Sequence, residues 1–147
     1  MNYESIKKLA ANHHYTSFTA LQEDTFSNPE VFSNRNLFII GQTSTGKTLI
    51  PVLLYAQSLR EAQEAGTPKP KMLFTVPYRA LAAQKLQELQ RFFCGQDLQI
   101  VQSTGEFRQD DGAILNAQVD IAVIITEKAF KYQARDARFF SRYDYLV

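Results

Sequence analysis

The sequence has few of the residues that mark disulfide-rich, fibrous or membrane proteins. Its 147 residues contain one cysteine, Cys94, which excludes an internal disulfide framework. Six glycines and five prolines are too few for a collagen-like or low-complexity chain. No apolar run approaches the ~18–20 residues of a membrane-spanning helix, and the polar N-terminus lacks a signal-peptide core. We therefore expect a cytoplasmic or nuclear protein with no membrane partner.

Positive and negative charges are nearly balanced. Lysine and arginine number 16 against 15 aspartates and glutamates, a net charge of +1. This balance argues against a strongly basic nucleic-acid clamp, although a local basic patch remains compatible with it. The 45% hydrophobic and 21% charged content is typical of one folded, soluble domain of this length. Because Phe92 and Phe93 precede Cys94, we expect its thiol to be buried.

The most specific pattern in the chain is a complete phosphate-binding loop, Gly41-Gln42-Thr43-Ser44-Thr45-Gly46-Lys47-Thr48. An apolar segment at 37–40 predicts a buried strand before it, and a helix is predicted after it. Such a loop aims backbone N–H groups and a helix N-terminus at one anion. The lysine can reach the β- and γ-phosphates, and the last hydroxyl can join a Mg²⁺ shell. The sequence thus predicts a nucleoside triphosphate site, with Lys47 and Thr48 as catalytic residues and Thr48 also as metal ligand.

The rest of the chain alternates between helical and strand patterns. Two N-terminal helices are expected at 3–11 and from Thr16 or Ser17 to about Phe26, with turns at Asn28-Pro29 and Ser33-Asn34. Further strands are predicted at 72–76, 98–101, 119–125 and 143–147, and further helices at 47–65, 79–93 and 127–138, with a short helical or irregular stretch at 113–115. Such alternation predicts an α/β fold with a mainly parallel sheet and right-handed crossovers. Ligands of such sheets lie beyond the carboxyl ends of the strands.

Four other segments carry residues suited to nucleotide or nucleic-acid chemistry. An aromatic residue and an amide lie upstream of the loop, in Tyr15-Thr16-Ser17-Phe18-Thr19-Ala20-Leu21-Gln22. A strand end leads into Pro77-Tyr78-Arg79-Ala80-Leu81-Ala82-Ala83-Gln84. The last two segments, Ser103-Thr104-Gly105 and Ile125-Thr126-Glu127-Lys128-Ala129-Phe130, each follow a predicted strand. In this order and spacing, the segments resemble the first RecA-like domain of superfamily 2 helicases, the DEAD-box and DExH proteins.

The resemblance covers residues 15–147 and implies a RecA-like, three-layer P-loop fold, here an incomplete domain whose residues 1–35 form N-terminal helices with a Q-motif-like segment. It implies that ATP, with Mg²⁺, binds the 41–48 loop, with Tyr15 stacking near the adenine and Gln22 bonding its edge. His14, Phe18 and the absence of a proline there depart from the family pattern. It also implies nucleic-acid contacts from the strand-end segments, at Pro77, Arg79, Thr104, Gly105, Thr126 and Lys128.

Two parts of the family pattern lie beyond the sequence. In the family, an apolar strand like residues 145–147 is followed by an acidic pair that binds Mg²⁺ and positions the attacking water. A second RecA-like domain then supplies arginines that stabilise the transition state. We therefore expect the chain to be the N-terminal fragment of an ATP-dependent helicase or translocase acting on DNA or RNA. The fragment alone is expected to bind nucleotide weakly without turnover.

Two other functions are compatible with the loop alone. One is a different P-loop enzyme, a kinase or GTPase. A GTPase should show an Asn-Lys-x-Asp segment, which is absent, and Arg135-Asp136-Ala137-Arg138 is a poor substitute for a kinase lid. The other is a nucleotide-sensing module that does not hydrolyse its ligand. Preference for ATP over GTP would separate the helicase from the GTPase.

Overall fold

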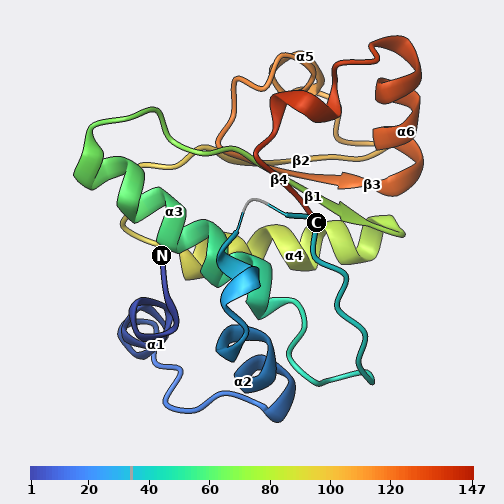
Figure 1. The fold of residues 1–147 in the computed structure, drawn as a ribbon. Helices are drawn as coiled ribbons and strands as arrows, with labels where there is room; N and C mark the ends of the chain where they lie inside the picture. Colours follow the sequence, from blue (N-terminus) through green and yellow to red (C-terminus); the bar gives the residue numbers. More distant parts are fainter. Residues whose placement is uncertain (34) are drawn as a thin grey trace. The chain divides into compact units, whose positions relative to one another are not determined.

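The chain folds into two units that differ in secondary structure. A computed structural model describes residues 1–33 and 35–147, and Met1–Pro68 and Lys69–Val147 form its two compact units (Figure 1). The first unit is helical, and the second contains a four-stranded sheet. Asn34, part of a turn predicted from the sequence, lies outside the described residues.

In residues 1–33 and 35–68 the first unit has four helical elements, and its two N-terminal helices begin with capping boxes. Asn2 caps the first helix and Thr19 the second, so that backbone N–H groups at both starts are paired. The last helix ends at Gly66, whose φ of 65° is the left-handed conformation that favours glycine. The elements are α1 (Tyr3–Asn12), α2 (Ala20–Ser27), the 3₁₀ turn η1 (Pro29–Phe32) and α3 (Leu49–Ala65). Helix α1 packs against both α2 and α3.

The strand predicted at 37–40 does not form. Residues 36–42 have no regular secondary structure, and the side chains of Phe38 and Ile40 are 90% and 76% exposed. A strand requires a neighbour that pairs with its N–H and C=O groups. In the part of the chain that the structure describes, no strand pairs with these residues. The apolar character of the segment was therefore insufficient to make it a strand.

The second unit has a parallel sheet of strand order β2-β3-β1-β4. Strand β1 pairs with β3 from Met72↔Ile121 to Val76↔Ile125, while β2 extends the sheet beyond β3. Each pair is parallel, as the alternating pattern predicts. The elements are β1 (Met72–Val76), α4 (Arg79–Phe92), β2 (Ile100–Ser103), α5 (Asp111–Leu115), β3 (Ile121–Ile125), α6 (Thr126–Arg135), the 3₁₀ turn η2 (Phe140–Arg142) and β4 (Tyr145–Leu146).

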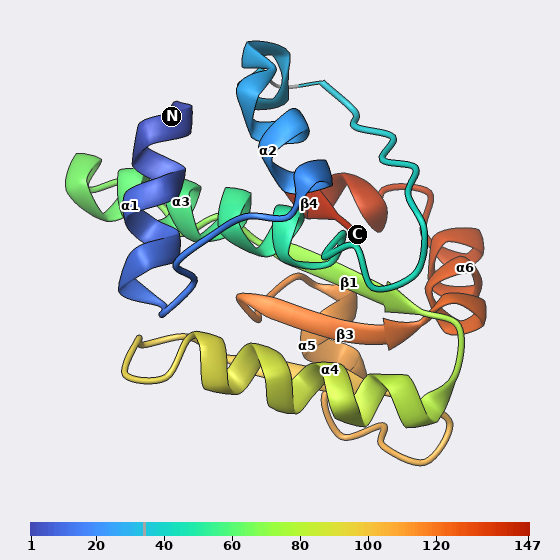
Figure 2. The same ribbon diagram turned by 90° about the horizontal axis from the view of Figure 1, so that it is seen from below.

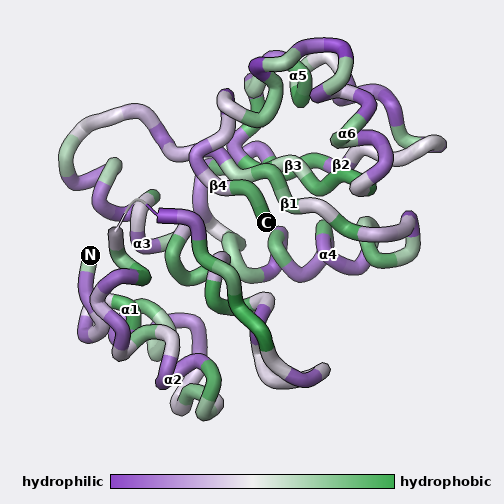
Figure 3. Tube along the Cα trace, turned by 45° about the vertical axis from the view of Figure 1, so that its right-hand side comes forward, coloured by the Kyte–Doolittle hydropathy of each residue, from purple (hydrophilic) through white to green (hydrophobic). Residues whose placement is uncertain are grey.

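Helices cover both faces of this sheet. In Figures 1 and 2, α4 lies on one face, and α5 and α6 lie on the other. Successive side chains of a strand point to opposite faces, so Leu73, Ala122 and Ile124 join Ile114, Tyr132 and Phe139 in one buried cluster. Figure 3 colours β1 and β3 as the apolar centre of the unit.

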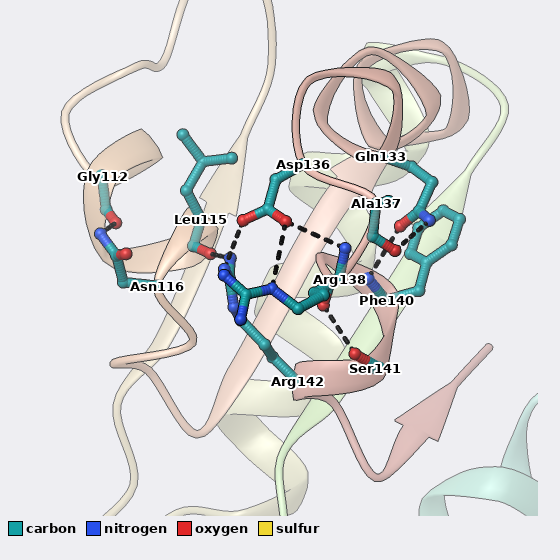
Figure 4. Close-up of polar contacts among 10 residues, drawn as sticks. All are labelled: Gly112, Leu115, Asn116, Gln133, Asp136, Ala137, Arg138, Phe140, Ser141 and Arg142. Carbon is teal, nitrogen blue, oxygen red and sulfur yellow. Dashed lines mark hydrogen bonds and ion pairs between the residues drawn. The ribbon is translucent and has the colours of Figure 1, made fainter.

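Hydrogen bonds and an ion pair hold the segment between α6 and β4 in place (Figure 4). The Asp136 carboxylate accepts the Arg138 N–H at 2.9 Å and pairs with the Arg142 guanidinium, which also donates to the carbonyl of Leu115. The Gln133 amide donates to the Ala137 carbonyl at 2.7 Å. These bonds fix the turn that returns the chain to the sheet edge at β4.

Most predicted elements are confirmed, with shifted ends. The strand at 72–76 is confirmed in full, whereas the one predicted at 98–101 lies at Ile100–Ser103. The prediction that Cys94 is buried is wrong: it lies in the turn after α4, where Phe93 takes the buried position and Cys94 faces solvent. No helix in the described ranges is long and apolar enough to cross a membrane.

Candidate functional site

The first candidate site is the 41–48 loop in the first unit, which leads directly into α3. Two loop residues, Ser44 and Gly46, have positive φ angles of 66° and 78°. Gly46 has a second reason to lack a side chain, because a Cβ there would lie 2.2 Å from the Gln22 amide nitrogen. Gly41 would meet Leu21 at 2.9 Å in the same way. The loop is therefore a tight backbone cradle in which a side chain at either glycine would displace a neighbouring side chain, and at Gly46 would also be strained by the positive φ.

The segment from Thr19 to Gln22 ties this cradle to α2. The Gln22 side-chain amide donates to the carbonyl of Gly46 at 2.9 Å, and its oxygen accepts the Thr19 N–H at 3.0 Å. The Thr19 hydroxyl donates to the carbonyl of Thr45 at 2.8 Å. Gln22 itself is buried. The segment predicted to read adenine thus contacts the phosphate loop directly.

Lys47 is folded back onto its own loop. Its ammonium group donates to the carbonyl of Gly41 at 2.7 Å and to that of Gln42. The Thr45 hydroxyl also donates to the Gln42 carbonyl, at 2.8 Å. Thr48 is exposed at the N-cap of α3, with no hydrogen bond from its side chain to the helix. A lysine and a hydroxyl at the start of a helix are the donor set that suits a polyphosphate with its cation.

The two residues predicted to contact adenine, Gln22 and Tyr15, lie in different surroundings. Gln22 lies against Gly46, and its amide retains one hydrogen and its oxygen one lone pair for a further partner. Tyr15 belongs to the linker between α1 and α2, where its N–H donates to the Ala10 carbonyl and its ring is partly exposed. The adenine contacts of both residues remain predictions.

The second candidate site lies at the carboxyl edge of the sheet in the second unit. Pro77 and Arg79 follow β1, Thr104 and Gly105 follow β2, and Thr126 and Lys128 begin α6 directly after β3. Because β3 lies between β1 and β2 and all three are parallel, their carboxyl ends are neighbours. The topology thus brings the predicted nucleic-acid residues into one row, here named the strand-end row (residues 77–79, 104–107 and 126–128).

Hydrogen bonds join the three parts of the strand-end row. The Thr126 hydroxyl donates to the carbonyl of Val76 at 3.1 Å. The Arg79 guanidinium pairs with the Glu106 carboxylate at 2.7 Å, and both side chains are largely exposed. Arg79 also lies over Gly105, where a Cβ would be 2.7 Å from the guanidinium. Glycine at 105 therefore lets the arginine cross the row.

Two predicted contact residues of the row face inward. The Thr104 hydroxyl accepts the N–H groups of Glu106 and Phe107 at 3.3 and 3.2 Å, and Thr104 is only 2% exposed. The Lys128 ammonium donates to the Thr104 carbonyl at 2.9 Å and to Asp111 at 2.7 Å. Both side chains hold the turn after β2 in place, and their direct contact with nucleic acid remains a prediction.

A polar cluster that sequence reasoning missed lies behind the row. Asp111 accepts from Lys128 and, at 2.6 Å, from the Ser103 hydroxyl. Burial alone would raise the pKa of Asp111, but these hydrogen bonds outweigh it and lower the pKa below the usual carboxyl value. Burial, together with the Asp111 carboxylate, raises the pKa of Tyr132 to about 12. The only sequence signal was an acidic residue at the start of a short apolar stretch.

A family model described as DEAD/DEAH box helicase matches residues 19–147. Over 78 residues the chain is 33% identical to the ATP-dependent DNA helicase Hel308 of Methanocaldococcus jannaschii, a match that covers 53% of this chain and 6% of that protein.

A crystal structure of a hypothetical ATP-dependent RNA helicase from Sulfolobus tokodaii has the same fold. It superposes with a TM-score of 0.63 at 18% identity, covering 99% of this chain and 40% of that chain. The chain thus spans less than half the length of either relative.

Proposed function

The chain belongs to the DEAD/DEAH box helicase family, and we propose that it is the ATP-binding N-terminal portion of the first RecA-like domain of a nucleic-acid helicase or translocase. The observation that carries the proposal is the cradle at 41–48, closed by Gln22 and supplied with Lys47 at the start of α3. Its glycines leave the backbone accessible to an anion, which an ordinary turn does not require.

In the proposed nucleotide site, Lys47 exchanges its two loop carbonyls for the β- and γ-phosphate oxygens of ATP. This exchange replaces neutral acceptors with charged ones, which form stronger hydrogen bonds. Thr48 would offer its hydroxyl to Mg²⁺, whose positive charge would offset that of the phosphates. Gln22, and Tyr15 upstream of it in the same segment, would select adenine.

In the proposed nucleic-acid site, the strand-end row holds one strand of DNA or RNA. Arg79 and the start of α4 suit a phosphate, because a cation and helix N–H groups meet there. Gly105 leaves room for Arg79 to cross the row, Pro77 follows β1 directly, and Thr126 ties the start of α6 to the end of β1. Lys128 contributes by holding the turn at Thr104.

Turnover is proposed for the parent protein alone. The acidic pair that polarises water and the arginines of a second RecA-like domain would complete the ATP site, with the two domains closing around the strand. Without them, residues 1–147 would bind nucleotide weakly and hydrolyse almost none. The proposed place of action is the cytoplasm, or the nucleus of a eukaryote.

Lys47→Ala tests the nucleotide site. Hydrogen bonds to charged groups contribute about 1.5–3 kcal/mol, so ATP affinity should fall by roughly 10- to 150-fold in an ATP·Mg²⁺ titration. The matched control is Lys8→Ala, which removes an exposed lysine of α1 and should leave affinity unchanged. Unaltered ATP binding by Lys47→Ala would refute the site, and stronger binding of GTP than of ATP would refute the helicase assignment.

A further inference from the structure

Two large aromatic side chains are exposed at the strand-end row. Tyr78 lies between β1 and α4 and is 60% exposed, and Phe107 lies in the turn after β2 and is 51% exposed. Isolated exposed apolar residues are common on protein surfaces. These two are distinguished by their position, because each belongs to a loop at the edge where the predicted nucleic-acid residues gather.

The backbone holds both aromatic residues in defined positions. The Phe107 carbonyl accepts the Thr104 N–H at 3.0 Å, while its own N–H donates to the Thr104 hydroxyl at 3.2 Å. Tyr78 is the N-cap of α4 in an extended conformation, and its carbonyl accepts the Ala82 N–H at 3.3 Å. The rings are therefore presented from fixed turns, which reduces the entropy lost when they bind a ligand.

A cation accompanies each ring, and one ion pair connects the two loops. Arg79 follows Tyr78 and Arg108 follows Phe107. The Arg79 guanidinium pairs with Glu106 at 2.7 Å, and Arg108 donates to the Gly105 carbonyl at 3.0 Å. Proteins that bind single-stranded nucleic acids combine aromatic rings, which stack on the bases, with arginines, which contact the phosphates.

We propose that Tyr78 and Phe107 stack on the bases of an unpaired nucleic-acid strand whose phosphates contact Arg79. The inference rests on the proposed function and adds that recognition depends on bases as well as on the backbone. In a duplex, base faces are covered by neighbouring base pairs, so only an unpaired strand offers them to the two rings. The strand-end row should therefore prefer a single strand over a duplex.

The test compares three labelled 12-nucleotide ligands by fluorescence anisotropy with the whole 147-residue chain at low ionic strength. They are an oligothymidine, an abasic strand of equal length and a duplex. The oligothymidine should bind more tightly than the abasic strand. Tyr78→Ala and Phe107→Ala should each weaken oligothymidine binding by roughly five- to 150-fold, the measured range for one stacked base, and leave abasic binding unchanged.

The controls separate stacking from other effects of the substitutions. Tyr78→Phe retains the ring and should bind as the wild type does. Phe130→Ala removes an equally exposed aromatic side chain of α6, outside the two loops, and should have no effect. Because Tyr78 and Phe107 are exposed, thermal unfolding of their alanine variants should match that of the wild type.

The outcomes distinguish this inference from the function on which it rests. If oligothymidine and abasic strands bind equally and the alanine variants bind as the wild type does, stacking is refuted. The phosphate contacts of the proposed function then stand, and Arg79→Gln should weaken both strands alike. If the wild type binds none of the three ligands, the proposed nucleic-acid function fails and the stacking inference fails with it.

Discussion

The 41–48 loop and the strand-end row are both candidate ligand sites, but they are built in opposite ways. The loop is one run of eight residues in which backbone groups, Lys47 and Thr48 follow one another in sequence, and a Cβ added at Gly41 or Gly46 would meet a neighbouring side chain. The row is assembled from three segments that the order β2-β3-β1 brings together, and side chains bridge its parts. Atoms added at its glycines should therefore damage the loop, whereas the row should be damaged by the removal of side chains that bridge its parts.

Gly46→Ala should have the largest effect. It places a side chain at φ 78° and 2.2 Å from the Gln22 amide, so strain of about 1–3 kcal/mol adds to the loss of a hydrogen bond of about 1 kcal/mol. ATP affinity should fall at least tenfold, and the urea midpoint should decrease.

Gly66→Ala is the matched control for this change. Gly66 also has a positive φ, 65°, but no atom lies within 4 Å of its Cβ position. It should lose about 1 kcal/mol of stability from backbone strain and retain full ATP binding. Equal behaviour of the two variants in the ATP titration would show that the loop has no special intolerance to added atoms.

Lys128→Met tests the effect of removed atoms on the row. The Lys128 side chain is 13% exposed, and its loss removes the charged partner of Asp111, which keeps its bond from Ser103, and the donor to the Thr104 carbonyl. Breaking such a pair should cost about 2–3 kcal/mol in the free energy of unfolding, measured in urea. Lys131→Met removes an exposed i,i+4 pair with Glu127 on the same helix and should cost under about 0.5 kcal/mol. Similar losses would contradict the bracing role.

The loop is one short segment and the row is assembled from three, and this difference also determines how well each could be predicted from the sequence. The pattern at 41–48 could be identified from the sequence because its glycines, Lys47 and Thr48 lie within one short segment. The alternation of strands and helices likewise predicted β1 and α4, whose apolar spacing is local. What the sequence did not reveal is the contact of Gln22 with Gly46, because it joins residues 24 positions apart.

The errors of prediction concern features that depend on distant partners. Residues 37–40 are apolar like a buried strand, yet pairing decides whether a strand forms. The nucleic-acid contacts of Thr104 and Lys128 stay a prediction, and the structure adds that their side chains face the turn and Asp111. A residue type and spacing cannot tell an outward side chain from one that holds its neighbour in place.

Acid should lower the stability of the chain, because Asp111 behind the row becomes protonated. Its pKa is lower in the folded chain than the ordinary value of about 3.9, so its contribution to stability is complete above that value and is lost as the pH falls through the folded pKa. The unfolding free energy should therefore decrease below about pH 4. Asp111→Asn should be less stable at pH 7 and lose less on acidification, as measured by urea titration at pH 7 and pH 3. An equal loss in both proteins would contradict the assignment to Asp111.

Gly105→Ala should have the smallest effect. It tests whether the strand-end row tolerates an added atom better than the 41–48 loop does. Its Cβ would lie 2.7 Å from the Arg79 guanidinium, the flexible end of an exposed side chain that can move away, and the φ of Gly105 is not positive. Stability should change by under about 0.5 kcal/mol. Single-strand affinity should fall by roughly two- to fivefold, since Arg79 shifts from its place over the row. Gly112→Ala, at a helical position with no neighbour within 4 Å, should leave affinity unchanged. If Gly105→Ala proved as damaging as Gly46→Ala, the row would be as intolerant of added atoms as the loop, and the distinction between a backbone cradle and a side-chain row would fail.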